Sequence, residues 1–355
     1  KWLISFVVIV MASIAQSSAW NIAWFQFIKV CEGVIFYLYV SHYAIRRFEL
    51  VRSCLALMLG GFLQASIAIA QFIQQSDIGF YWLGEGVIRP TMKGVAVFYT
   101  GAGERVMRAY GTTPHPNVLA GYLLLSLSAL YVAWNYFYEN DRAFHRLVIG
   151  VYVVVLFGFF LTFSRTAIGV WAMVGAGWVA VAWWYQLSLW HRLKQMVYVT
   201  GVVVVLFLGC FWPEVSARLW ISPHEEAVEL RTYFIEESVD AGWNWFGVGV
   251  GQFVPWLMEK NPGQPSWRYQ PVHNVYLLIY SEIGLIGLGV FVVALILLWK
   301  DFWGRTTGYQ RAYVSTYVGL VMGIAFFDHF LWTLQQGHFV WWGALALLSV
   351  ARQNN

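Results

Sequence analysis

Long apolar segments separated by short polar connections make up most of this chain. Two longer polar stretches, 74–116 and 213–272, interrupt the series. The pattern predicts an all-α, polytopic transmembrane bundle of about ten spans, because each apolar segment approaches the roughly 20 residues that cross a bilayer as a helix. The predicted spans are 2–19, 22–41, 53–73, 117–138, 145–163, 166–186, 195–212, 273–299, 312–329 and 332–350.

The same pattern divides the chain into three parts. Residues 1–212 hold about seven predicted spans and the outer loop 74–116, residues 213–272 form a large helical loop outside the membrane, and residues 273–355 hold about three spans. The first residue is Lys1 rather than methionine. We therefore expect a fragment or a processed form, with further helices upstream.

The composition agrees with a chain solvated by lipid. Of 355 residues, 59% are hydrophobic and only 11% are charged, whereas a soluble domain carries about 25% charged residues. The three cysteines have no CxxC spacing, which argues against a disulfide framework or a cysteine metal site. No basic run of the kind that binds nucleic acid is present, so we expect no nucleic-acid partner.

Lysine and arginine are concentrated in alternate short connections. Those at 42–52, 139–146, 187–196 and 300–311, with Lys1 and Arg352, hold 12 of the 22 Lys and Arg residues. Positive loops stay in the cytoplasm. This distribution predicts an integral protein of the cytoplasmic (inner) membrane whose two long loops face the periplasm or the exterior.

The predicted outer face collects the unusual polar residues of the chain. They are His115, Asn117, Ser164, Arg165, Arg231, His273, Asn274, Asp328 and His329. Each has a structural explanation when taken alone: an interfacial anchor for Arg165, and a helix-entry position for His273 or for His115 ahead of a helix capped by Asn117. Their gathering on one side favours a functional site on that side, since ionisable groups near the membrane commonly mark function.

Arg231 falls in a predicted helix of the large loop. Ser222-Pro223-His224-Glu225 reads as a capping box that starts this helix, which would run to about Asp240. No carboxylate stands three or four positions from Arg231. A cation on an apolar helix face needs an anion, and a diphosphate is one candidate. The glycines of 247–251 that follow lack a βαβ unit, which favours a tight turn at the membrane interface over a nucleotide-binding loop.

The spacing of His273-Asn274, nine residues and Gly284-x-x-Gly287 resembles the signature of the O-antigen ligase family. Ser164-Arg165-Thr166 and His115-Pro116-Asn117 resemble two further elements of that family, so that the likeness covers roughly 110–340. The superfamily also includes O-antigen polymerases and protein O-oligosaccharyltransferases. Its members typically have about twelve membrane helices.

The resemblance implies a metal-independent, inverting glycosyltransferase without a cofactor. Its donor would be a glycan linked to polyprenyl (undecaprenyl) diphosphate in the bilayer. The acceptor would be a lipid A-core sugar in a ligase, another lipid-linked repeat unit in a polymerase, or a serine or threonine in a protein transferase. No HExxH motif or paired aspartates appear, in keeping with a site that needs no metal.

The residues permit a division of roles for such a reaction. Arg165 and Arg231 would hold the diphosphate, and His273 would accept the proton of the acceptor hydroxyl. Gly284 and Gly287 would lie on nearly the same helix face as His273, leaving room for a neighbouring helix or a lipid tail. The residues expected to bind substrate are Asn274, His115, Asn117, Ser164 and His329.

Two classes of non-enzymatic protein are the main alternatives. A secondary transporter would show internal repeats, broken helices and ionisable residues at mid-membrane. A lipid flippase would distribute charge along the crossing. The sequence shows no convincing repeat and gathers its polar residues at one face, which favours the enzyme.

Overall fold

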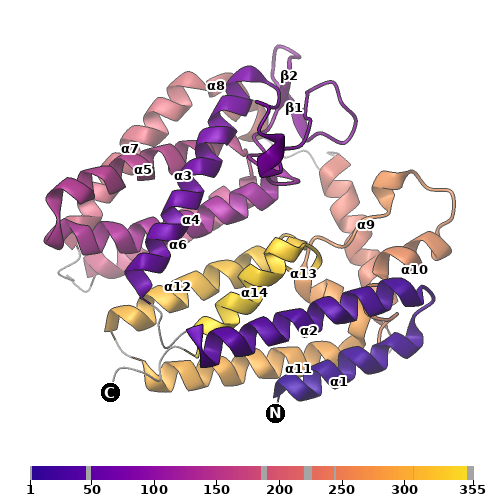
Figure 1. Ribbon diagram of the computed structural model, residues 1–355. Helices are drawn as coiled ribbons and strands as arrows, with labels where there is room; N and C mark the ends of the chain where they lie inside the picture. The colour runs from indigo at the N-terminus through magenta and orange to yellow at the C-terminus, as the bar shows by residue number, and fades with distance from the viewer. Residues whose placement is uncertain are drawn as a thin grey trace. The chain divides into compact units, whose positions relative to one another are not determined.

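The computed structural model describes residues 2–44, 49–184, 190–219, 226–243, 245–306 and 308–349, and nearly all of their regular structure is helical (Figure 1). The chain forms two compact units, which we describe separately. The central unit comprises residues 49–221, and the terminal unit combines residues 1–48 with 222–355. The all-α, polytopic architecture predicted from the sequence is confirmed.

The central unit is a helical bundle. Its helices are α3 (Leu50–Gln74), α4 (Pro116–Asn140), α5 (Arg142–Leu161), α6 (Arg165–Trp184), α7 (Trp190–Cys210) and α8 (Trp212–Leu219). Helices α3, α4 and α5 pack against one another along their lengths. Small residues allow this close approach, since a Cβ added to Gly158 would lie 2.7 Å from the Cβ of Ala65.

The segment between α3 and α4 has a small core of Ile88, Met107 and Tyr110, and polar contacts join it to α3. It contains the 3-10 turn η3 (Tyr81–Leu83) and an antiparallel pair of short strands, β1 (Val97–Tyr99) and β2 (Arg105–Met107). The buried Glu85 carboxylate accepts hydrogen bonds from Gln71 Nε2 of α3 (2.7 Å) and from the backbone N–H of Phe80 (2.5 Å). These bonds hold the segment over the end of α3.

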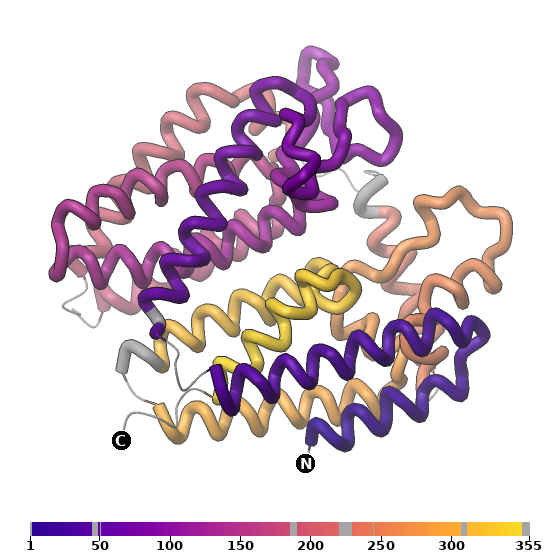
Figure 2. Tube along the Cα trace, viewed as in Figure 1, coloured from indigo at the N-terminus to yellow at the C-terminus, as the bar shows by residue number. Residues whose placement is uncertain are grey.

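The terminal unit joins the first two helices to the last part of the chain. Its elements are α1 (Trp2–Ser13), η1 (Ile14–Gln16), α2 (Trp20–His42), α9 (Glu226–Ala241), α10 (Phe253–Lys260), η4 (Ser266–Arg268), α11 (Val275–Arg305), α12 (Gly308–Ala325), α13 (Phe330–Thr333) and α14 (Gln335–Leu347). Helix α1 runs beside α11, and α14 packs against α2 (Figure 2). Buried aromatic rings, including Phe6, Phe291 and Trp341, fill the space between these helices.

Seven helices of the described residues are long and apolar enough to cross a membrane: α2 to α7 and α11. The other three predicted spans are helical but are not among these seven. The segment 2–19 forms a shorter apolar helix over Trp2–Gln16, 312–329 falls on the 18-residue α12, and 332–350 is broken into α13 and α14. Within the described residues, seven of the ten predicted spans therefore meet both the length and the hydropathy criterion.

Helix α11 is broken nine residues after its first residue, at Gly284. The backbone there has φ 74° and ψ −174°, which lies outside the helical region and is open to glycine alone among common residues. The sequence interpretation that placed Gly284 and Gly287 on one continuous helix face with His273 is therefore wrong, because the helical register does not run through the break.

The glycine-rich turn of 247–251 docks into this break. Val248 N–H donates to Ser281 O (2.9 Å), Gly249 N–H donates to Glu282 O (2.9 Å), and Ile286 N–H donates to Trp245 O (3.3 Å). Gly247, Gly249 and Gly251 all have positive φ. The turn thus supplies partners for the helix groups that the break leaves open, and its glycines serve close backbone approach rather than nucleotide binding.

We predict that Gly284→Ala destabilises the protein strongly. A Cβ at this position would lie 2.3 Å from Trp245 O, and the backbone conformation alone costs a non-glycine residue about 1–3 kcal/mol. Thermal unfolding in detergent measures the effect, with the loss of the monodisperse chromatographic peak as the readout. Gly289→Ala in the same helix is the matched control, since a Cβ there meets nothing within 4 Å; equal melting temperatures for the two variants would contradict the prediction.

Candidate functional site

His273 stands directly before α11, on a helix entry fixed by its neighbour Asn274. Asn274 is the N-cap of α11: its Oδ1 accepts from Leu277 N–H (2.9 Å), while its Nδ2 donates to Phe326 O (3.1 Å) just beyond α12. Both ends of the amide are therefore engaged. This arrangement ties the start of α11 to the end of α12 and sets the position of His273.

The imidazole of His273 lies among aromatic rings. It stacks on His329, with ring centroids 5.0 Å apart and an interplanar angle of 8°, and it meets the edge of the buried Phe234 of α9 at 6.3 Å. Its Nδ1 atom is buried and has no hydrogen-bond partner among the described residues. Buried polar atoms ordinarily have a hydrogen-bond partner, and a substrate group could be that partner for Nδ1.

His329 is oriented by the turn between α12 and α13. Asp328 Oδ1 accepts from the backbone N–H groups of His329 (2.8 Å) and Phe330 (3.3 Å). His329 Nδ1 is 2.8 Å from Thr333 Oγ1, whose hydroxyl donates to His329 O (3.2 Å). Because the Thr333 proton is used in that way, Nδ1 of His329 is the protonated nitrogen and Nε2 carries the lone pair.

The electrostatic surroundings keep both imidazoles neutral. Burial lowers the pKa of His273 to about 4; Asp328 opposes this shift, whereas His329 and Arg231 add to it. Burial also lowers the pKa of His329, and again Asp328 opposes the shift. At neutral pH the unprotonated nitrogen of His273 is thus available as a proton acceptor.

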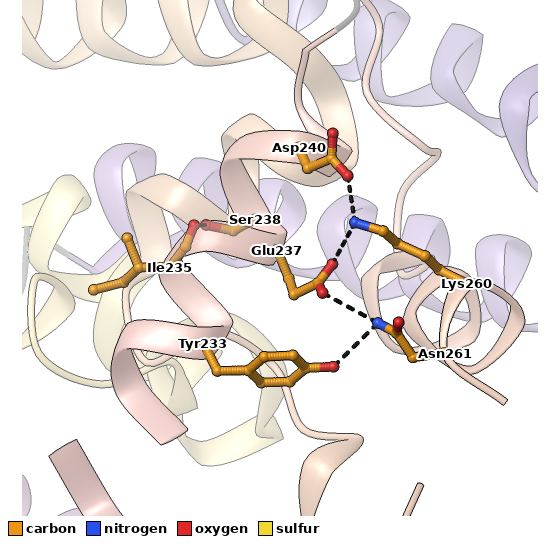
Figure 3. A network of polar contacts seen from close by, with 7 residues as sticks. All are labelled: Tyr233, Ile235, Glu237, Ser238, Asp240, Lys260 and Asn261. Carbon is orange, nitrogen blue, oxygen red and sulfur yellow. Dashed lines mark hydrogen bonds and ion pairs between the residues drawn. The ribbon is translucent and has the colours of Figure 1, made fainter. Parts of the chain in front are cut away.

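Arg231 of α9 lowers the pKa of His273, and two acidic residues of the same helix, Glu237 and Asp240, pair with Lys260 instead. Lys260 of α10 forms ion pairs with Glu237 (2.8 Å) and with Asp240, as Figure 3 shows. Asn261 Nδ2 bridges Glu237 Oε1 (3.1 Å) and the Tyr233 hydroxyl (3.2 Å). Among the described residues no ion pair or hydrogen bond of the Arg231 side chain is found. The predicted capping box at 222–225 lies outside the described residues.

The four remaining predicted site residues lie in the central unit. His115 is itself the N-cap of α4, because its Nδ1 accepts from Asn117 N–H (3.1 Å) with Pro116 in the first turn. The interpretation that Asn117 caps this helix is therefore wrong. Ser164 is buried in the turn before α6, and Arg165 is the first residue of that helix.

Arg108 is a residue of this region that the sequence analysis missed. Its side chain is only 8% exposed; Nε donates to Thr162 O (2.7 Å) and Nη2 donates to Asn117 Oδ1 (2.7 Å). It thereby joins the start of α4 to the turn that presents Ser164 and Arg165. Nothing in the sequence distinguishes Arg108 from the exposed Arg105 three positions earlier, since both stand in the same polar stretch.

The turn that precedes α6 is strained. Phe163 has φ 47°, a left-handed conformation that a residue with a Cβ adopts at a cost, and its neighbour Thr162 is fully buried. This left-handed residue reverses the chain direction between α5 and α6, and α6 begins two residues later at Arg165. Backbone outliers of this kind are concentrated at functional sites.

The structure thus brings together His273, Asn274 and His329, with Arg231 in their electrostatic surroundings, in the terminal unit. It brings together Asn117, His115 and the Thr162–Arg165 turn in the central unit, through Arg108 and through the first turn of α4. That the two groups of residues meet in one site stays a prediction.

The fold and these two groups of residues define a polytopic membrane protein with an ordered loop helix over a histidine at a helix entry. Residues 150–292 match the family model described as O-antigen ligase, a span that includes Arg165, Arg231 and His273. The resemblance drawn from the sequence motifs is confirmed by this match, which supports membership of the O-antigen ligase and polymerase superfamily. A comparison with curated proteins finds no match.

We predict that Arg108→Gln destabilises the central unit by about 1–3 kcal/mol, because the buried Thr162 carbonyl and the Asn117 amide lose a charged donor. Thermal unfolding in detergent measures this loss. Arg105→Gln removes an arginine from an exposed position of β2 and is the matched control. If the two variants melted together, Arg108 would not be the residue that joins α4 to the α5–α6 turn.

Proposed function

We propose that this protein transfers a glycan from a polyprenyl-diphosphate donor to an acceptor hydroxyl on the extracytoplasmic side of the inner membrane. The observation that carries the proposal is the state of His273. This imidazole is half-buried, its buried Nδ1 has no hydrogen-bond partner among the described residues, and burial, with a smaller contribution from Arg231, lowers its pKa to about 4. A neutral imidazole accepts a proton, and an adjacent guanidinium attracts an anionic leaving group.

The proposed reaction is a single displacement. The acceptor oxygen attacks the anomeric carbon of the donor sugar as the bond from that carbon to the diphosphate oxygen breaks, and the acceptor proton passes to His273. Inversion at the anomeric carbon follows from one displacement. Arg231 and Arg165 would neutralise the negative charge that builds up on the departing polyprenyl diphosphate, the kind of electrostatic stabilisation that often dominates catalysis.

The other predicted site residues divide into two roles in this proposal. His115, Asn117, Ser164 and His329 would contact the donor or the acceptor. Asn274 would instead be a positioning residue, because its amide is already engaged with Leu277 and Phe326. The apolar spans would hold the prenyl chain within the bilayer.

Ligation to a lipid A-core acceptor is the activity that we propose first. Polymerisation and transfer to protein are the alternatives within the same superfamily, and they differ from ligation only in the acceptor. A single glycan block added to a core acceptor indicates ligation, and a ladder of products made from the donor alone indicates polymerisation.

We expect His273→Ala to lower glycan transfer by about 10²–10⁴-fold, the usual contribution of a general base. The measurement uses purified protein in vesicles with a labelled lipid-linked glycan and follows acceptor-dependent release of polyprenyl diphosphate. Arg231→Ala should also lower the rate, whereas the exposed His191→Ala should leave it unchanged. Movement of intact donor lipid across the bilayer without release would point to a flippase, and full activity of His273→Ala would refute the assigned role.

The pH dependence should separate the free enzyme from its complex with donor. Because burial and Arg231 lower the pKa of His273 to about 4, the neutral base is fully present at neutral pH. The kcat/KM should therefore fall only as the pH drops toward about 4. A bound diphosphate raises the pKa of a nearby imidazole, so the acid limb of kcat should lie at higher pH than that of kcat/KM. Coincident limbs near pH 6.5 would contradict both the burial and the charge coupling.

A further inference from the structure

The terminal unit brings His273, Asp328 and His329 into one cluster, although Asp328 and His329 lie far from His273 in the sequence. An imidazole nitrogen of each histidine and a carboxylate oxygen of Asp328 all lie within 4.8 Å of one another. The cluster is built on three helix boundaries: His273 precedes α11, and the adjacent pair joins α12 to α13. All three side chains belong to one compact unit.

The hydrogen bonds of His329 leave its Nε2 lone pair available to a ligand. The Thr333 hydroxyl accepts from His329 Nδ1–H and donates to His329 O, which leaves the lone pair of His329 on Nε2. This is the second-shell arrangement that fixes the tautomer of a metal-binding histidine. Asp328 is oriented by two backbone N–H groups, those of His329 and Phe330, that donate to Oδ1.

We propose that His273, Asp328 and His329 form a binding site for a divalent transition-metal ion such as Zn²⁺. Two imidazoles and one carboxylate, with a fourth position left for water or substrate, are a donor set typical of open zinc sites. Donor atoms about 2.0–2.2 Å from a zinc ion lie roughly 3.4 Å apart. Side-chain adjustments of about 1 Å would therefore complete the coordination.

The charges near the cluster determine its affinity for a metal ion. Asp328 is its one carboxylate, and the Arg231 guanidinium opposes the approach of a cation. We therefore expect reversible binding, weaker than that of structural zinc sites with several thiolates. A metal ion held by His273 takes up an electron pair of the imidazole, so on the proposed function Zn²⁺ competes with the acceptor proton and inhibits transfer.

Metal binding is tested on the full chain in nanodiscs after treatment with a chelator. Zn²⁺ titration by calorimetry should show one saturable site, and Co²⁺ should give the visible absorption of a four- or five-coordinate ion. Asp328→Asn and His329→Ala should abolish both signals. His42→Ala and His191→Ala remove exposed histidines and should preserve them.

Thr333→Ala keeps all three ligands and removes only the group that orients His329. Loss of such an outer partner typically weakens metal binding 10–100-fold, so this variant tests the geometry even if a ligand substitution prevents folding. Absence of a saturable Zn²⁺ site in the wild-type protein, or equal affinity in wild type, Thr333→Ala and His329→Ala, would overturn the proposal.

The inhibitory effect is measured separately in the vesicle transfer assay. Zn²⁺ should inhibit transfer over the concentration range in which it binds, and a chelator should restore the rate. Metal binding without any transfer activity would refute the proposed function but not the metal site. Transfer without metal binding would refute the metal site alone, and stimulation by Zn²⁺ would refute the competition at His273.

Discussion

The terminal unit depends on the backbone hydrogen bonds between the break of α11 and the glycine-rich turn of 247–251. A helix interrupted at Gly284 leaves N–H and C=O groups open in an apolar environment, where each unsatisfied group costs several kcal/mol. Trp245 and the glycine-rich turn of 247–251 supply these partners. The same turn follows α9 and precedes α10. Its hydrogen bonds to α11 therefore also fix these two loop helices near the first turns of α11.

A second break follows the same principle at the end of the chain. The carbonyls of Trp332 and Thr333, the last two residues of α13, accept from Gln26 Nε2 (3.2 Å) and Lys29 Nζ (2.8 Å) of α2. His338 also contacts Trp332 O. Lys29 thus has a structural partner within an apolar helix, which accounts for a cation in a predicted span without a transport pathway. The contacts hold the segment that carries Asp328 and His329.

The helices could be predicted from the sequence, whereas the breaks in α11 and between α13 and α14 could not. Hydropathy located the seven helices that are long enough to span, because lipid imposes a long apolar segment on each span. It did not locate the interruption at Gly284, since a glycine within an apolar run has the same appearance whether it is helical or not. The roles of Arg108 and Asp328 were equally hidden, because each depends on partners that only the fold brings near: Thr162 and Asn117 for the first, His273 for the second.

The candidate site balances two opposing demands on His273. Burial beneath α9 and the charge of Arg231 make the neutral imidazole the stable form, which leaves a lone pair ready but makes it a weak base. Asp328 partly offsets this effect, and an anionic substrate beside Arg231 would offset it further. On the proposed function, the histidine gains basicity when the diphosphate arrives and loses it when the diphosphate leaves. The arginine that binds the leaving group therefore also couples proton acceptance to occupancy of the site.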